Sequence, residues 1–391
     1  MDSASEPMPE TPGAIGIART GFVRHNTSDP GRDLLERLGN CNLELVVIFA
    51  SYNADSSAVI ESVAGSFAPT PVVGCTTAGE ITHEGYTDGW IVAIGFPKSH
   101  FRAKILSVPD LGSFNAQDLI DLMIGNRNAM MEEVPNWHHE FTFLLIDGLS
   151  TREDVLVSEL APGLGPVPLF GGSAGDGTRF DSTYVLHDGH ALENAAILIQ
   201  IRTRCPVKVF KFDHLVPTSQ RMVVTEADPA RRIVREINAE PAAREYARIL
   251  RKDPEQLTTF TFAAHPVAVK IGGEYHVRAI QQVTEDGDLV FFSAIDEGLV
   301  LTLAEPRDMI GHLSEEIKLL AKEGLPDIVL GCDCILRRLE AQERQMTGAI
   351  SKILSNNRVV GFSTYGEQFN SIHVNQTLTG VAIYPPEDER Q

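Results

Sequence analysis

Short apolar runs recur along the first half of the chain, and most are rich in β-branched residues. The runs at 43–50 and 141–147 are almost continuously apolar. Continuous apolar runs of this length indicate strands that are buried on both faces. Shorter runs predict further strands at 70–75, 90–96, 101–107, 183–186, 195–201 and 207–212. The strands at 183–186 and 195–201 flank Asp188-Gly189, which predicts that they form a hairpin.

Helical spacing separates the strands of the first half. Apolar residues at helical spacing predict helices at 32–38, 56–67, 115–126 and 153–160. Strands and helices alternate first, and strands that read as antiparallel follow. Because of this order, we predict a mixed α/β (α+β) fold with partly antiparallel sheets and flanking helices.

The segment Gly171–Gly177, GGSAGDG, is rich in small residues and follows the apolar residues 168–170. Glycine lets the backbone turn with positive φ or approach another group closely. A small-residue loop at a strand end is where α/β domains usually bind their ligands. The segment therefore predicts either a ligand-binding loop or a tight turn without a ligand.

The composition changes after Val224, and we place a domain boundary near residues 226–230. In the second half the pattern predicts helices at 229–238, 241–250, 308–323 and 336–354. It predicts strands at 260–271, 276–283, 289–294, 327–330, 359–362 and 379–384. We expect four segments, which are a disordered tail at 1–13, an N-terminal module at 14–228, a C-terminal module at 229–384 and a tail at 385–391. No internal repeat stands out.

The chain is long and acidic. It has 391 residues, a formal net charge of −20 and a pI of about 5.0. Nucleic-acid binding needs a basic face to meet phosphate, so we expect no nucleic-acid partner. No apolar run reaches the roughly 20 residues that span a bilayer, and the acidic start does not read as a signal peptide. We therefore expect a cytoplasmic protein without a membrane partner.

Five cysteines are present, at positions 41, 75, 205, 332 and 334. A sparse, odd set of this kind reads as free thiols in a reducing compartment. Cys332 and Cys334 are closer together than the usual C-x-x-C metal spacing, and no second cysteine pair accompanies them. A metal or redox role for these two residues stays open, although the spacing disfavours it.

Three common enzyme motifs are missing from the sequence. The chain contains no G-x-x-x-x-G-K-[ST], no H-E-x-x-H and no Rossmann glycine pattern. We therefore expect a protein that is not an enzyme. A hydrolase or transferase built on the Gly171 loop and Asp176 is the alternative from another functional class.

Several short motifs occur in a fixed order along the chain. The first group consists of Phe49-Ala50-Ser51, Val73–Glu80 and Gly171–Asp176. The second group consists of His265-Pro266, Arg278, Glu297-Gly298, Cys334, Arg337, Gly361–Glu367 and Asn375-Gln376-Thr377. With these motifs the chain resembles the FIST proteins, which pair an N-terminal and a C-terminal FIST module. The resemblance covers nearly all of residues 14–384.

The resemblance implies a sensory, ligand-binding module that acts together with signalling proteins. Some bacterial members of this family bind haem, sense nitric oxide and control a histidine kinase or a cyclic-di-GMP enzyme. By resemblance we expect a haem-based nitric oxide sensor, with iron held in haem b and such a signalling partner. A homodimer is possible, and the sequence does not decide the oligomeric state.

His187 resembles the haem ligand of the haem-binding members, and it follows an apolar strand. Haem needs an axial ligand inside an apolar pocket, which a histidine can supply. By the same resemblance, we expect Tyr184, Gly171, Gly172 and Ser173 to contact the cofactor.

Two other histidines compete with this assignment. His190 lies on the same predicted hairpin and is the rival ligand. If the protein binds no haem, His187 is interpreted as a surface histidine at a turn. His265 matches a family position, but before a proline it reads as a structural histidine that fixes an extended segment.

Five polar residues of the second module are expected to form a small pocket. They are Arg278, Arg337, Tyr365, Glu367 and Asn375. Arginine with hydroxyl and amide donors suits a carboxylate, such as that of an amino acid. The alternative function is therefore a metabolite sensor without haem. The other reading is a set of structural hydrogen bonds, because buried polar groups need partners in either case.

Overall fold

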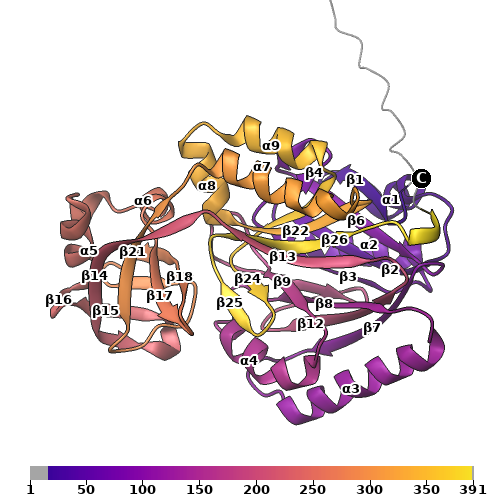
Figure 1. The fold of residues 1–391 in the computed structure, drawn as a ribbon, viewed down its shortest axis with the longest axis horizontal. Coiled ribbons are helices and arrows are strands. Elements are labelled where there is room, and N and C mark those ends of the chain that lie inside the picture. The colour runs from indigo at the N-terminus through magenta and orange to yellow at the C-terminus, as the bar shows by residue number, and fades with distance from the viewer. Residues whose placement is uncertain (1–15, 390–391) are drawn as a thin grey trace, which may run out of the picture.

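The computed structural model describes residues 16–389, so the tail expected at 1–13 lies outside the described residues. The chain forms a larger body and a smaller lobe, which lies to one side of the body (Figure 1). The lobe is built from residues 215–306, and the body from the residues before and after it. Helices accompany mixed sheets in the body, so the predicted α/β class is confirmed.

The body consists of three units that repeat one order of elements. The first unit contains β1 (Arg19–Arg24), α1 (Pro30–Leu38), β2 (Leu43–Ser51), α2 (Ser56–Phe67), β3 (Val72–Thr77), β4 (Glu80–Thr82), β5 (Gly85–Thr87) and β6 (Trp90–Pro97). The second contains β7 (Phe101–Val108), α3 (Ala116–Glu133), β8 (His139–Ile146), α4 (Glu153–Leu164), β9 (Leu169–Ser173), β10 (Val185–His187), β11 (His190–Leu192) and β12 (Ala196–Thr203).

The third unit follows the same order, but the lobe is inserted after its first strand. It contains β13 (Val207–Asp213), α7 (Met309–Leu320), β22 (Ile328–Cys334), α8 (Ile335–Glu343), α9 (Thr347–Asn356), β23 (Val359–Thr364), β24 (Glu367–Phe369), β25 (Ile372–Val374) and β26 (Thr377–Ile383). Two helices, α8 and α9, replace the single crossover helix of the other units.

Each unit supplies four adjacent strands of one six-stranded sheet. The orders are β1-β6-β2-β3-β10-β11, β7-β12-β8-β9-β24-β25 and β13-β26-β22-β23-β4-β5. The third and fourth strands of each sheet are parallel, and the other neighbours are antiparallel. The last two strands are a hairpin from a different unit, so the units exchange hairpins in a cycle. The sequence analysis found no repeat, and the structure corrects it.

One glycine marks the same place in each parallel pair. Gly74, Gly171 and Gly361 are each the third residue of the second parallel strand. A Cβ at any of the three would collide with a backbone carbonyl oxygen of the neighbouring strand. This close approach requires glycine. The sequence analysis placed Gly171 in a loop, but residues Leu169–Ser173 form β9 because they pair along β8.

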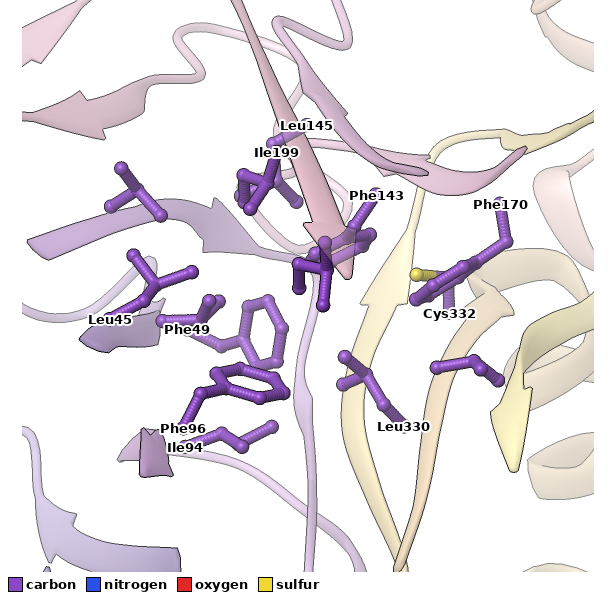
Figure 2. Close-up of a cluster of buried hydrophobic side chains, with 14 of the residues drawn as sticks. Leu45, Phe49, Ile94, Phe96, Phe143, Leu145, Phe170, Ile199, Leu330 and Cys332 are labelled. Atoms are coloured by element: carbon purple, nitrogen blue, oxygen red, sulfur yellow. The ribbon is translucent and has the colours of Figure 1, made fainter. Parts of the chain in front are cut away.

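The main core lies where the inner faces of the three sheets meet, and Figure 2 shows side chains from all three units in it. Phe49 stacks on Phe362 with ring centroids 4.5 Å apart, and Phe143 stacks on Phe170 at 4.6 Å. Phe49 and Phe143 meet edge to face at 6.3 Å. Because one core serves all three units, its burial stabilises them together.

Helices cover the outer face of each sheet and form three separate apolar clusters. α1 and α2 cover the first sheet, α3 and α4 cover the second, and α7 and α9 cover the third. The runs at 43–50 and 141–147 are therefore buried on both faces, as predicted. None of the helices within residues 16–389 is both long enough and apolar enough to span a bilayer.

The lobe has its own core, which includes Tyr246 and Phe262. Its elements are β14 (Leu215–Asp228), β15 (Ile233–Ile237), β16 (Glu240–Pro241), α5 (Ala242–Leu250), α6 (Thr259–Ala264), β17 (Val267–Ile271), β18 (Glu274–Arg278), β19 (Ile280–Val283), β20 (Leu289–Phe291) and β21 (Val300–Pro306). The chain enters through β14 and leaves through β21, and these two strands pair with each other. The expected division at 228/229 falls at the end of β14, inside the lobe.

Residues 229–238 were predicted to be helical, but only a short 3-10 turn precedes β15. Arg232 has a φ of 55°, which ends the turn. Val234 and Ile237 then pack into the lobe core. The tertiary burial of β-branched side chains therefore overrides the local helical pattern.

Two other predicted elements are divided in the structure. The predicted strand at 260–271 is α6 followed by β17, because Thr258 caps the helix and the His265-Pro266 step ends it. The predicted helix at 336–354 is α8 and α9, separated where Gln345 has a φ of 57°. A helix cannot continue through a positive φ.

The predicted hairpin of 183–186 with 195–201 is also wrong. β10 pairs with its neighbour β11 and with β3, whereas β12 pairs with β7 and β8. The two predicted partners therefore lie in different sheets. The reason is the exchange of hairpins between units, which proximity along the chain does not reveal.

Candidate functional site

The carboxyl ends of the parallel strand pairs form three equivalent positions in the body. They follow β2 and β3, β8 and β9, and β22 and β23. Open α/β sheets bind ligands beyond the carboxyl ends of their strands, so each position is a candidate. The three positions differ in what fills them.

A buried ion-pair network fills the position after β22 and β23. Arg337 Nε donates to Asp333 Oδ1 at 2.7 Å, and Arg337 Nη1 donates to His214 Nδ1 at 2.8 Å. The Tyr86 hydroxyl donates to Asp333 Oδ2, and His214 Nε2 lies 2.9 Å from Glu340 Oε2. All five side chains are buried. The arginine that was expected in the metabolite pocket is therefore engaged with protein partners.

A polar cavity of about 330 Å³ lies at the position after β2 and β3. Tyr52, Tyr184 and Asp176 contribute to its lining, and the Arg179 guanidinium stacks on the Tyr52 ring at 4.8 Å. The Asp176 carboxylate accepts backbone N–H groups of residues 180–182 and a tyrosine hydroxyl. The residue that the hydrolase alternative would use is thus already occupied as a hydrogen-bond acceptor.

The lobe covers the position after β8 and β9. Arg232 reaches the N-terminus of α4, where its Nη2 lies 2.7 Å from Glu153 Oε2 and 3.2 Å from Asp154 Oδ2. Its Nη1 donates to the Phe292 carbonyl oxygen, and Ala294 N donates to Asp154 Oδ2 at 2.9 Å. Figure 1 shows the β24–β25 hairpin between the lobe and α4. We call this region the lobe junction.

Buried polar atoms without a hydrogen-bond partner concentrate at the lobe junction. Nine such side-chain atoms occur among the described residues, and six of them belong to β18 or to the segment from β24 to the residue before β26. The six are His276 Nδ1, Arg278 Nε, Glu367 Oε1, Gln368 Oε1, His373 Nε2 and Gln376 Oε1. Buried polar groups usually find partners. The junction therefore has more hydrogen-bonding capacity than the described chain uses.

Arg278 and His373 provide two of these groups. Arg278 forms no ion pair with a described carboxylate, and its Nη1 donates to the His373 carbonyl oxygen at 3.4 Å. Gln368 Nε2 donates to His373 Nδ1 at 3.3 Å, so the proton of the neutral ring lies on Nε2. Burial lowers the pKa of His373, which keeps the imidazole neutral at pH 7. Each residue thus offers one N–H to an anionic oxygen.

Three other predicted pocket residues surround the same hairpin. Asn375 Nδ2 donates to the Tyr365 carbonyl oxygen at 3.4 Å, and Asn375 Oδ1 accepts from Ser293 Oγ of the lobe. Glu367 Oε2 accepts from Thr377 N at 3.0 Å and from Thr377 Oγ1 at 2.7 Å. Burial raises the pKa of Glu367 well above its usual value, which favours the protonated carboxyl. The structure therefore brings four of the five predicted residues together.

The junction is closely packed in this structure. A cavity beside it measures about 30 Å³, and His276 and Asn375 belong to its lining, whereas Arg232, Arg278 and His373 do not. This volume holds one or two water molecules. A cavity of about 920 Å³ lies elsewhere, between β1 and the start of β23, and none of the six unpartnered atoms belongs to its lining residues. We prefer the junction because its chemistry, and not its volume, points to a ligand.

Comparison with protein families covers both parts of the chain. The FIST N domain matches residues 44–240, and the FIST C domain matches residues 242–370. The first match alone covers half of the chain. The chain belongs to the FIST family. FIST domains are sensory domains of signal transduction that bind small ligands. No curated protein matches this FIST protein.

The fold of this FIST protein does not gather the residues that were assigned to haem. Gly171, Gly172 and Ser173 lie in β9, whereas His187 ends β10 in another sheet. The His187 side chain is 18% exposed, and its Nε2 lies 3.4 Å from Asp188 Oδ2. It lines none of the three cavities above. In this structure these residues do not form together the apolar enclosure that haem needs around its ligand.

The remaining candidate residues have structural surroundings. His190 is exposed on β11, and the His265 carbonyl oxygen accepts from the Tyr246 hydroxyl at 2.6 Å. Burial raises the pKa of both Cys332 and Cys334 well above the usual value, which disfavours their thiolates. In the described part of the chain, no group of three or more His, Cys, Asp or Glu side chains is placed to hold a metal ion.

Residues 171–175 of this FIST protein also match the G-x-S-x-G pattern of α/β-hydrolases. In those enzymes the serine lies on an exposed turn next to a histidine base. Ser173 is instead fully buried in β9, and its Oγ accepts from Gln368 Nε2 at 3.0 Å. No described histidine hydrogen-bonds to this serine. The geometry therefore lacks the pairing that would activate a nucleophile.

Sequence patterns did not point to Arg232, Asp154 or His373. Arg232 meets Asp154 across 78 positions of the chain, because the lobe folds over α4. His373 is a polar residue between two apolar ones in a three-residue strand. This alternation is the only signal that marks it, and it is too short to be distinctive.

Proposed function

We propose that this FIST protein senses a small carboxylate, such as an amino acid, that binds at the lobe junction. The pair of unpartnered donors, Arg278 Nε and His373 Nε2, supports the proposal. Hydrogen bonds between a guanidinium and a carboxylate are about twice as strong as those between neutral groups. A carboxylate would therefore satisfy both buried donors and neutralise an arginine that has no ion pair.

The position of the site suggests how binding would be passed on. Its donors come from both sides of the junction, because Arg278 belongs to the lobe and His373 to a hairpin of the body. A ligand that contacts both sides favours one lobe position over another. We propose that a signalling partner reads this position. The family resemblance suggests a histidine kinase or a cyclic-di-GMP enzyme as that partner.

Titration of the purified full-length protein with the standard L-amino acids tests the proposal. A ligand at about 100 times its dissociation constant stabilises the folded state by about 2.7 kcal/mol, which a thermal-shift assay detects. Arg278→Gln should abolish the shift. Arg235→Gln is the matched control, because Arg235 is an exposed lobe arginine that pairs with Glu226. A shift that survives in Arg278→Gln, or a flat wild-type response, would contradict the proposal.

Haem-based sensing of nitric oxide is the competing proposal from the family resemblance. It rests on the position of His187, and the surroundings of that residue do not supply an apolar enclosure. The two proposals use different residues, so Arg278→Gln and His187→Ala separate them.

A further inference from the structure

At two of the three equivalent strand ends, a buried arginine neutralises acidic side chains. The two arginines come from different parts of the chain. In the third unit, Arg337 of α8 pairs with Asp333 near the end of β22, four positions earlier in the chain. In the second unit, Arg232 comes from the lobe and pairs with Glu153 across 79 positions. Only the second arginine belongs to a part of the molecule that is separate from the sheet it covers. A guanidinium that the lobe supplies can leave together with the lobe.

The attachment of the lobe permits such a movement. Two antiparallel strands, β14 and β21, are its covalent connections to the body. Apolar residues of the lobe, such as Phe292, also pack against Leu336 and Tyr365 of the body.

The pairing of β14 with β21 is interrupted between Pro217 and Arg221, where the register shifts. Residues 219–221 are exposed. Irregular pairing of this kind weakens the ladder and lets strands bend. We therefore expect the connection between lobe and body to bend most easily at residues 217–221.

The acids under the lobe are kept ionised. Burial disfavours the ionised form of Asp154, but the guanidinium groups of Arg232 and Arg278 and the hydrogen bond from Ala294 N favour it and lower the pKa of Asp154. Glu153 is 2% exposed and contacts the same guanidinium. A buried carboxylate without a counter-charge is strongly unfavourable. If Arg232 leaves, another cation must therefore take its place.

We propose that Arg232 is an internal competitor of the ligand, an inference that rests on the carboxylate-sensing function proposed above. The ammonium group of an amino acid replaces the Arg232 guanidinium at Glu153 and Asp154. The carboxylate of the same ligand accepts from Arg278 and His373. One cation is exchanged for another, so the buried acids keep their counter-charge while Arg232 withdraws and the lobe is released.

The exchange makes the site selective for zwitterions. A carboxylate without an ammonium group, such as an N-acetyl amino acid, leaves Glu153 and Asp154 without a counter-charge if it displaces Arg232. It therefore cannot complete the exchange. The lobe junction thus takes free amino acids and rejects their N-acetylated forms.

Amide hydrogen exchange of the full-length protein without ligand tests the Arg232 contact by itself. Arg232→Gln should raise exchange at Ala294 and Ala279 by about tenfold or more, since the N–H groups of these lobe residues donate to Asp154 and Asn375 of the body while the lobe is closed. Arg235→Gln, an exposed change three residues away on β15, should leave exchange unchanged. Asp154→Asn breaks the bridge from the other side and provides the test if Arg232→Gln does not fold. Unchanged exchange in the bridge variants overturns the proposal.

Calorimetric titration with the L-amino acid of largest thermal shift, and with its N-acetyl form, tests the exchange. Arg232→Gln should bind the amino acid about tenfold more tightly, because the competing closed state is removed. The wild type should not bind the N-acetyl form. Equal binding of both forms, or weaker binding by Arg232→Gln, overturns the exchange. If no amino acid binds either protein, the sensing function fails, and faster exchange in Arg232→Gln still supports Arg232 as the group that holds the lobe.

Discussion

Gly74 and Gly361 occupy the same register position in two different sheets, and neither has room for a side chain. A Cβ at Gly74 would collide with the Ile48 carbonyl oxygen, and one at Gly361 would collide with that of Gly331. In both places the second parallel strand approaches the first so closely that only glycine fits. The match between distant positions is direct evidence that the units repeat one design.

Gly74→Ala should therefore lower the free energy of unfolding by about 1–3 kcal/mol, the usual cost of overpacking. Gly125→Ala is the control, because the Gly125 position in α3 has no atom within 4 Å of a new Cβ. That variant should gain up to about 1 kcal/mol from the higher helix propensity of alanine. Urea denaturation at 25 °C measures both. Equal effects at the two sites would show that the strands can separate to accept a side chain.

Glu80 at the start of β4 should make stability depend on pH. It is fully buried, and its carboxyl accepts from Thr77 Oγ1 at 2.6 Å and from Trp90 N at 3.0 Å. Burial raises the pKa of Glu80 to about 7. A raised pKa means that the folded state holds a proton that the unfolded state has released. The resulting stabilisation is complete below the unfolded pKa of about 4.3 and is lost as the pH rises through 7.

The stability of Glu80→Gln relative to the wild type should therefore increase by roughly 3–4 kcal/mol between pH 4 and pH 8, at about 1.4 kcal/mol for each pKa unit. The neutral amide does not need to lose a proton. Glu84→Gln, an exposed change four residues away, should show no such trend. Denaturant titrations across this pH range give the comparison. Parallel curves for the wild type and Glu80→Gln would mean that Glu80 ionises normally in the folded protein.

Tyr365 should stabilise the loop that follows β9. Its hydroxyl accepts from Asp176 N at 3.1 Å and donates to the Asp176 carboxylate. Tyr365→Phe leaves these buried groups with fewer partners, so it should cost about 1–3 kcal/mol. Tyr275→Phe removes a lobe hydroxyl that makes no hydrogen bond to the described residues, and it should be nearly neutral. Thermal unfolding of the two variants decides whether the loss of stability is specific to the Tyr365 hydroxyl. Equal losses in both variants would mean that removing any tyrosine hydroxyl has the same effect.

Haem binding remains a prediction from the family resemblance, and a haemin titration decides it. If the prediction holds, the protein gains a Soret band that shifts with nitric oxide. His187→Ala should then lose this band, and His190→Ala should keep it, with both variants folded by circular dichroism. A spectrum identical to that of free haemin would contradict haem binding, and loss of the band only in His190→Ala would contradict the assigned ligand.

Much of the candidate site was visible in sequence, but its assembly was not. Arg278, Tyr365, Glu367 and Asn375 were predicted as one pocket, and the structure places them around one hairpin. Arg337 was placed with them but lies in the buried network at another strand end. Asp333 lies only four positions from Arg337, but His214, which follows β13, reaches Arg337 only in the folded body. No local pattern encodes that contact.

The sequence by itself determined the buried strands, most helices and the α/β class, because apolar period and helix caps act within a few residues. It also determined the family, because the order of the short motifs can be recognised without knowing any contact between them. Only the tertiary structure decided which strands are neighbours, since the hairpins β4–β5, β10–β11 and β24–β25 each complete a sheet of another unit. It likewise decided that Arg232 meets Glu153. Such pairings follow from the burial of one core that the three units share. The free energy of burying this core depends on the whole chain and on no single segment.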